Sequence, residues 1–226
     1  MSRREELVVG IRDALPIVFG YLPIGVAYGI LAAQTGLSDI VTVSMSVFVF
    51  AGSSQLITVN MLGGGAGVLP IIMMTFLVNL RHLLMSASMS LHFKEADNRL
   101  LPVLSYIITD ESFAVSSANL PKREKKEIYF LGLGITAYLA WVISSWLGAS
   151  LGSFLPSSGS LGLDFVLPAM FIVLLVLQIK DSLDILVAIL AGLFSLLFVY
   201  ILPENWNIIL ATVVAATLGV LLERWS

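Results

Sequence analysis

The chain alternates long apolar stretches with short polar ones, and the apolar stretches have the length that a bilayer requires. A membrane-spanning helix needs about 20 mostly apolar residues. Eight stretches approach or exceed that length: residues 14–33, 40–62, 68–92, 101–119, 128–155, 165–179, 183–202 and 205–222. The pattern predicts an all-α integral membrane protein, a polytopic helical bundle of seven or eight transmembrane segments. Seven segments result if one stretch is only re-entrant.

Composition narrows the class of protein further. Hydrophobic residues make up 58% of the chain and charged residues 12%, whereas a soluble domain carries about 25% charged residues. The chain has no cysteine, and its two histidines lack a metal-ligand spacing, so we expect neither a metal nor a cofactor. Its 12 Lys and Arg residues are too few and too scattered for a nucleic-acid surface. We therefore expect one transmembrane domain over 1–226 that is not an enzyme.

A weak internal sequence similarity leaves open a division into two repeats, 1–120 and 121–226. Gly25-x-x-x-Gly29 precedes Asp39 and an apolar segment, and Gly148-x-x-x-Gly152 precedes Asp164 and another. Transporters are often built from two such repeats, either parallel or inverted. The alternative is that these glycine pairs only let helices pack closely.

The distribution of Lys and Arg predicts the orientation in the membrane. Basic residues gather in the cytoplasmic loops of membrane proteins. If the N-terminus is cytoplasmic and all eight segments cross, nine basic residues lie inside, against two outside, Lys94 and Arg99. The nine include the four in the loop 120–127 and also Lys180 and Arg224. The sequence thus predicts a cytoplasmic N-terminus.

Three consecutive segments place their most polar tract at the same depth, near the middle of the bilayer. The tracts are Ala51-Gly52-Ser53-Ser54-Gln55, Asn79-Leu80-Arg81-His82 and Thr109-Asp110-Glu111-Ser112. A charge at the bilayer centre costs at least about 2.5–3.5 kcal/mol, so such residues normally face a cavity or each other. We expect the three tracts to share one site.

The charges of these tracts do not balance. One Arg81 faces two adjacent acids, Asp110 and Glu111, whose side chains project about 100° apart on a helix. We expect one acid to pair with Arg81 and the other to carry a proton. His82 is a second candidate for the proton relay, because the pKa of an unperturbed histidine lies near neutrality.

The tract around Gly52 is a weak point at which the helix is expected to break. A broken helix presents free N–H groups that attract a carboxylate. The predicted substrate-binding residues are Gly52, Ser53, Ser54, Gln55, Asn79 and Arg81. We expect apolar residues such as Phe48, Phe50 and Met85 to receive an aliphatic side chain. The alternative is a close-packing patch between helices.

At these residues the sequence resembles the AzlC family, the large subunits of branched-chain amino acid exporters (the LIV-E family). The resemblance rests on the tracts Phe50–Gln55, Asn79–Ser86 and Thr109–Ala114. The N-terminal stretch with Pro16, Pro23, Gly25 and Gly29 also fits, and length and hydropathy match over the whole chain. It implies proton-coupled export of branched-chain amino acids across a bacterial inner membrane. It also implies a small AzlD-like membrane subunit as partner. Two alternatives remain open: a solute channel, and a scaffold subunit whose small partner holds the site.

Overall fold

The computed structural model describes residues 1–152, 154–155, 181–202 and 206–223, and a few single positions between 165 and 179. Every regular element in the described part is helical. In chain order the elements are α1 (Arg3–Asp13), α2 (Leu15–Gln34), α3 (Asp39–Phe48), α4 (Gly52–Gly63), α5 (Val68–Ser90), α6 (Leu101–Tyr106), α7 (Asp110–Asn119), the 3-10 turn η1 (Leu120–Lys122), α8 (Lys126–Gly152), α10 (Ser182–Val199) and α11 (Trp206–Glu223). The sixth predicted segment, 165–179, lies mostly outside the described residues.

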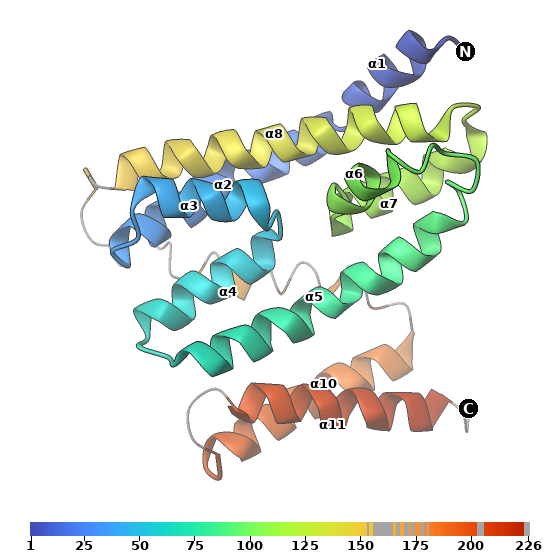
Figure 1. The fold of residues 1–226 in the computed structure, drawn as a ribbon. Helices are drawn as coiled ribbons and strands as arrows, with labels where there is room; N and C mark the ends of the chain where they lie inside the picture. The colour runs from blue at the N-terminus through green and yellow to red at the C-terminus, as the bar shows by residue number, and fades with distance from the viewer. Residues whose placement is uncertain are drawn as a thin grey trace.

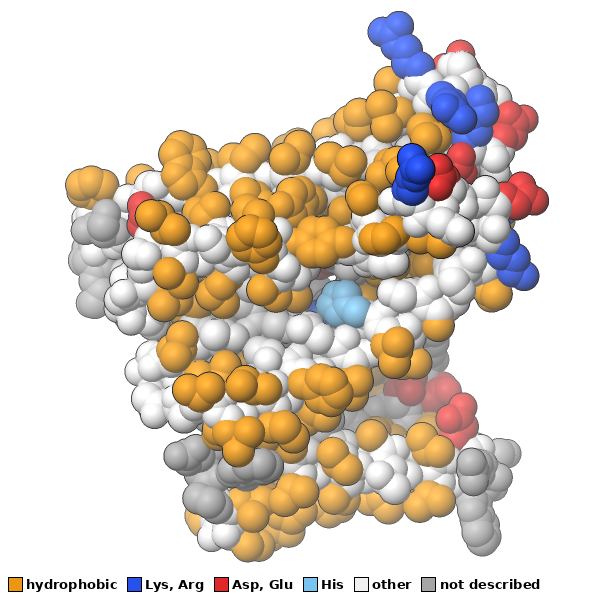
Figure 2. All heavy atoms as spheres, viewed as in Figure 1, with side chains coloured by type: hydrophobic (Ala, Val, Ile, Leu, Met, Phe, Trp, Pro, Cys, Tyr) orange, Lys and Arg blue, Asp and Glu red, His pale blue; other side chains and the backbone are white. Residues whose placement is uncertain are grey.

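Four of these helices, α2, α5, α8 and α10, are long and apolar enough to cross a membrane. Their ends lie within three residues of the predicted ones. α5 carries large apolar side chains that remain exposed, among them Ile72, Phe76 and Leu83, and apolar side chains cover much of the visible surface (Figure 2). Such an all-round apolar exterior is typical of helices in lipid. The chain is thus a helical membrane protein, as predicted.

The helices α2 and α8 make the most extensive contact of any two elements in the described part and run side by side in the same direction (Figure 1). Small residues set their spacing. A Cβ atom added to Gly29 would lie 2.3 Å from the carbonyl oxygen of Ser145, and one added to Gly148 would lie 2.1 Å from that of Val26. Backbone therefore packs against backbone. Close packing, the simpler reading of both glycine pairs, is confirmed.

The helices α3 and α4 form a hairpin that enters the bundle and turns back, so that residues 40–62 do not cross as one helix. We call the end of the bundle that holds the N-terminus the near end and the opposite end the far end (Figure 1). α3 starts after α2 at the far end and reaches the middle of α8, where Tyr138 donates to the carbonyl oxygen of Val47. α4 leads back, because Gly63 lies against Thr35, just after α2.

The turn between α3 and α4 lies just before the predicted break. Phe50 has a φ of 45°, a left-handed conformation that non-glycine residues rarely adopt. Gly52 then begins a new helix, so that Gly52, Ser53 and Ser54 form its first turn. The unwound residues are thus Val49–Ala51 rather than the glycine and the serines.

A second hairpin, α6 with α7, enters from the near end, although a single span was predicted for 101–119. Thr109 caps α7: its side chain accepts from the N–H of Ser112, and its own N–H donates to the Ser112 side chain. These local bonds replace the continuous helical ladder. α7 returns to the near end, where Arg123 pairs with Asp13 at 3.4 Å.

The two hairpins change the expected distribution of charge. The loop 91–100 lies at the near end, because Phe93 packs against Phe130 with ring centroids 5.5 Å apart. Lys94 and Arg99, expected at the far end, therefore lie with the N-terminus. Nine basic residues gather at the near end: Arg3, Arg4, Arg12, Lys94, Arg99, Lys122, Arg123, Lys125 and Lys126. Figure 2 shows charged side chains at this end. Lys180 and Arg224 lie outside the described residues.

The first 119 residues repeat one plan in opposite directions. α2 crosses and is followed by a hairpin from the far end, and α5 crosses back and is followed by a hairpin from the near end (Figure 1). α8 then crosses in the direction of α2. The predicted halves, 1–120 and 121–226, stay a prediction, because Asp164 and most of 153–180 lie outside the described residues.

Candidate functional site

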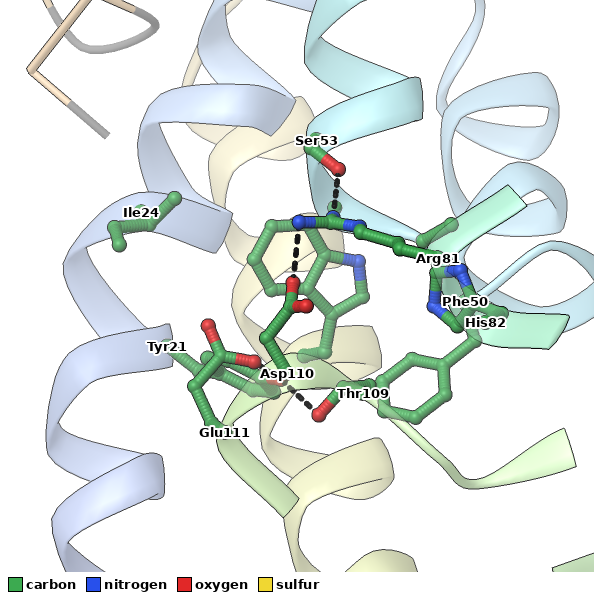
Figure 3. A pocket seen from close by; sticks show the side chains of 12 residues that line it. Tyr21, Ile24, Phe50, Ser53, Arg81, His82, Thr109, Asp110 and Glu111 are labelled. Carbon is green, nitrogen blue, oxygen red and sulfur yellow. Dashed lines mark hydrogen bonds and ion pairs between the residues drawn. The ribbon is translucent and has the colours of Figure 1, made fainter. Parts of the chain in front are cut away.

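The inner tips of the two hairpins meet at a cavity in the middle of the bundle (Figure 3). The cavity has a volume of about 450 Å³, including the space at its mouth. Its walls come from α2, α4, α5, α7, α8 and the turn before α4. The lining residues are Tyr21, Ile24, Phe50, Ala51, Gly52, Ser53, Arg81, His82, Thr109, Asp110, Glu111 and Trp141.

Arg81 of α5 connects both hairpin tips. One guanidinium nitrogen, Nη1, lies 2.6 Å from Oδ2 of Asp110, the first residue of α7. The other, Nη2, donates to the hydroxyl of Ser53 in the first turn of α4. Arg81 and Asp110 are each about a quarter exposed, at 26% and 27%. Figure 3 shows the guanidinium between its two partners. Arg81 thus pairs with one of the two acids, as predicted.

Glu111 points away from Arg81 and toward α2. Its Oε2 atom lies 2.6 Å from the hydroxyl of Tyr21. That hydroxyl also lies 2.8 Å from Oγ1 of Thr109. The described charges of the cavity, Arg81, Asp110 and Glu111, carry a formal charge of −1. The geometry therefore gives two neighbouring acids different partners, one a cation and the other a neutral phenol.

The N-terminus of α4 faces the cavity without a side-chain cap. Ala51 stands at the cap position and makes no side-chain hydrogen bond, and Gly52 and Ser53 follow it in the cavity wall. The first N–H groups of a helix lack intrahelical partners and carry a partial positive charge. Together with Arg81, this helix end makes one side of the cavity attractive to an anion.

Three of the predicted substrate-binding residues do not line the cavity. Ser54 and Asn79 bond to each other, with Oγ 2.6 Å from Oδ1. Gln55 is fully buried against α3 and α8: Nε1 of Trp141 donates to its Oε1, and its Nε2 donates to Ser46, both at 2.9 Å. An amide can satisfy its donors and its acceptor there, so Gln55 holds helices together and does not face the cavity.

The aliphatic pocket also differs in part from the expectation. Phe50 lines the cavity as expected. Phe48 is 77% exposed on the outside of the bundle, and Met85 is buried away from the cavity. The apolar walls come instead from Ile24 and Trp141, together with Phe50.

Sequence reasoning missed Tyr21, Ile24 and Trp141. Each lies inside a long apolar segment in which an aromatic or aliphatic residue is normally a packing residue. Only their contacts distinguish them. Tyr21 reaches Glu111, and Trp141 reaches Gln55 with its indole nitrogen.

The fold and the cavity define a class: a polytopic helical membrane protein with a charged site between two broken helical hairpins. Comparison with known proteins then gives the family. Residues 16–155 match the AzlC family, described as "AzlC protein", and the chain belongs to this family. All the cavity-lining residues fall within the matched range.

Several relatives share this similarity. The "Branched-chain amino acid transport protein AzlC" of Bacillus subtilis is 32% identical over 183 residues, which cover 79% of this chain and 71% of the relative. The "Inner membrane protein YgaZ" of Escherichia coli is 29% identical over 192 residues, 81% of this chain and 78% of the relative. A membrane protein of Archaeoglobus fulgidus is 31% identical over 229 residues, 100% of this chain and 98% of the relative. No solved structure gives a significant match.

Proposed function

We propose that this chain is a secondary transporter subunit that exports branched-chain amino acids and similar small apolar amino acids, in exchange for protons, across a bacterial inner membrane. The observation that carries the proposal is the cavity itself, in which Arg81 and an open helix end face two acids beside an apolar wall. The name of the Bacillus subtilis relative supports the substrate class.

The two charged ends of an amino acid match the two sides of the cavity. The substrate carboxylate binds Arg81 and the first N–H groups of α4. Nε of Arg81 is buried and has no hydrogen-bond partner among the described residues, so it remains as a donor. The ammonium group binds Asp110 or Glu111. Ile24, Phe50 and Trp141 contact the aliphatic side chain. Ser54, Gln55 and Asn79 support the hairpin around this site rather than touch the substrate.

The proton is carried by the acid that Arg81 does not neutralise. Glu111 bonds to the phenol of Tyr21 and not to Arg81, so a proton on it leaves the Arg81–Asp110 pair intact. His82 lies in the same cavity wall and completes the proposed relay. One added proton brings the net formal charge of the cavity from −1 to zero.

The near end faces the cytoplasm in this proposal. Nine basic residues at that end fit the rule that cytoplasmic loops are rich in Lys and Arg. A small AzlD-like subunit is the proposed partner, on the basis of the family resemblance. α5 and α10 carry exposed apolar side chains that can contact either lipid or such a subunit.

A carrier fits the geometry better than a channel does. The guanidinium of Arg81 bonds to both hairpin tips and so lies across the site. In a carrier such a bond breaks and reforms in each cycle, whereas in an open pore it would obstruct the path. In the carrier, the substrate carboxylate competes with Asp110 for Arg81.

The experiment uses proteoliposomes loaded with labelled leucine, with this chain alone or together with its small subunit. A carrier gives saturable efflux that external leucine accelerates. Efflux that rises linearly with concentration and is not accelerated identifies a channel. Absence of leucine movement in both preparations contradicts the proposal. Leucine binding to this chain alone separates it from a scaffold.

A further inference from the structure

Tyr21, a residue of α2, reaches with its side chain to the tip of the second hairpin. Its side chain is only 6% exposed, and its ring packs edge-on against Trp141, with centroids 5.3 Å apart. The hydroxyl reaches the tip of α7, 2.8 Å from Oγ1 of Thr109 and 2.6 Å from Oε2 of Glu111 (Figure 3). A buried phenol thus joins the two polar residues that flank Asp110.

The hydrogen bonds form a chain with a defined direction when Glu111 is charged. A carboxylate has no proton to give, so the single proton of the phenol points to Glu111. Thr109 accepts from the N–H of Ser112 at 3.2 Å, and its own hydroxyl proton is then free to point to the Tyr21 oxygen. Bonds of this kind polarise one another and strengthen the chain.

The same chain works in reverse when Glu111 is neutral. The protonated carboxyl group donates to the phenol oxygen, and the phenol proton turns toward Oγ1 of Thr109. No heavy atom has to move, because both oxygen–oxygen distances suit a hydrogen bond in either direction. A residue with only a donor or only an acceptor could not serve both states.

The other described groups around Glu111 do not take the role of its hydrogen-bond partner. α7 contributes Asp110, and α5 contributes Arg81 and His82. Arg81 is engaged by Asp110 and Ser53. α4 and α8 contribute Ser53 and Trp141 to the cavity, neither of which is charged.

We propose that Tyr21 is a positioning residue, which holds Glu111 at α2 in both its charged and its neutral form, so that Arg81 is left to Asp110 and the substrate carboxylate. The inference deepens the proposed function, on which it rests, by naming the residue that holds the proton-carrying Glu111 in place in both of its forms. Tyr21 itself never loses its proton permanently; it only changes the direction in which the proton points.

The first test does not depend on transport. In the purified full chain, infrared absorption of protonated carboxyl groups is followed over a pH titration. The band that Glu111→Gln removes belongs to Glu111. Tyr21→Phe keeps the ring but removes the hydroxyl, so this band is expected to shift in frequency and to broaden. An unchanged band in Tyr21→Phe would overturn the inference, whatever the protein transports.

Tyr28→Phe is the matched control. Tyr28 is also buried and packs against Trp141, but its hydroxyl contacts the carbonyl oxygen of Thr42, at 3.2 Å, and the sulfur of Met45, not an acid. We expect this variant to keep the wild-type Glu111 band. A change in Tyr28→Phe equal to that in Tyr21→Phe would assign the effect to packing and overturn the inference.

The second test measures the pH profile of leucine transport in proteoliposomes. Loss of the phenol removes a donor to the charged carboxylate, so Tyr21→Phe is expected to move the profile toward higher pH by about one unit. In a Glu111→Gln background, Tyr21→Phe should have no further effect on the profile. Transport by the wild type with an unshifted Tyr21→Phe profile contradicts this inference alone. Absence of transport by the wild type contradicts the proposed function instead.

Discussion

At the scale of single residues, the site separates two adjacent acids by giving them different partners. Asp110 and Glu111 follow each other in the first turn of α7, and their side chains leave the helix about 100° apart. One therefore faces α5 and Arg81, and the other faces α2 and Tyr21. The same angle makes it difficult for a single arginine to neutralise both.

Arg81→Gln is expected to weaken leucine binding about 10- to 100-fold, because a hydrogen bond to a charged group contributes about 1.5–3 kcal/mol. Arg81→Lys should recover only part of this loss, since an ammonium group does not bridge two partners as a planar guanidinium does. Leucine affinity measured by scintillation proximity on the purified protein tests both variants.

Arg123→Gln is the matched control for Arg81→Gln. Arg123 also pairs with an aspartate, Asp13, but it does so at the near end, 3.4 Å away and outside the cavity. Its removal should leave leucine affinity unchanged. An equal loss in both variants would show that the effect of Arg81 is a general loss of folding.

The sequence predicts the charged part of the site together with Phe50, Gly52 and Ser53, and it fails on other polar residues for a physical reason. A charge in lipid is costly, so Arg81 and its acids were expected to meet, and Arg81 does meet Asp110. Gln55 belongs to the polar tract near the bilayer centre that predicts the substrate site, yet it bonds to Trp141 and Ser46. A polar residue can be satisfied by the cavity or by a neighbouring helix, and the local sequence is the same in both cases.

At the scale of elements, close contact between α2 and α8 fixes the frame around which the hairpins sit. An added Cβ at Gly29 would meet Ser145 O at 2.3 Å, the nitrogen of Ala149 at 2.4 Å and the carbonyl carbon of Gly148 at 2.6 Å. All three are backbone atoms, which cannot turn aside as a side chain can.

Gly29→Ala is therefore expected to push α2 and α8 apart and to lower the melting temperature of the detergent-solubilised protein, since overpacking costs about 1–3 kcal/mol. Gly20→Ala on the same helix is the control. No described residue lies within 4 Å of a Cβ placed there, so helix propensity alone predicts an unchanged or slightly higher melting temperature. Equal melting temperatures for the two variants would contradict the packing of α2 against α8.

The long helices could be predicted from hydropathy, whereas the hairpins could not. α5 and α8 each form one apolar run of more than 20 residues. The stretch 101–119 is also largely apolar, but Thr109 and Ser112 cap each other in its middle and begin a new helix there. A single capping pair outweighs the hydropathy of the stretch, because it offers the backbone other hydrogen bonds.

At the scale of the whole molecule, the two hairpins change the side of the membrane on which loops lie. Counting each apolar stretch as one crossing places these loops on the wrong side. The turn before α3 and the loop after α4 both lie at the far end, since Gly63 contacts Thr35. The loop between α5 and α6 lies with the N-terminus, since Phe93 contacts Phe130. Each hairpin thus opens toward a different side of the membrane.

Single cysteines test this arrangement without further engineering, because the chain has none of its own. Asp39→Cys and Gly64→Cys should react with a membrane-impermeant thiol reagent from the same side. Asn98→Cys and Lys122→Cys should react only from the opposite side. All four positions are exposed. Labelling of Asp39→Cys and Gly64→Cys from opposite sides would mean that α3 and α4 cross as one segment, which contradicts the hairpin.

The central claim is that Glu111 couples leucine movement to a proton while Arg81 and Asp110 hold the site together. The measurement that tests it most directly compares leucine exchange with leucine accumulation driven by a pH gradient, in vesicles that contain either the wild type or Glu111→Gln. The account predicts that Glu111→Gln retains exchange and loses accumulation. Accumulation at the wild-type level in Glu111→Gln would contradict it.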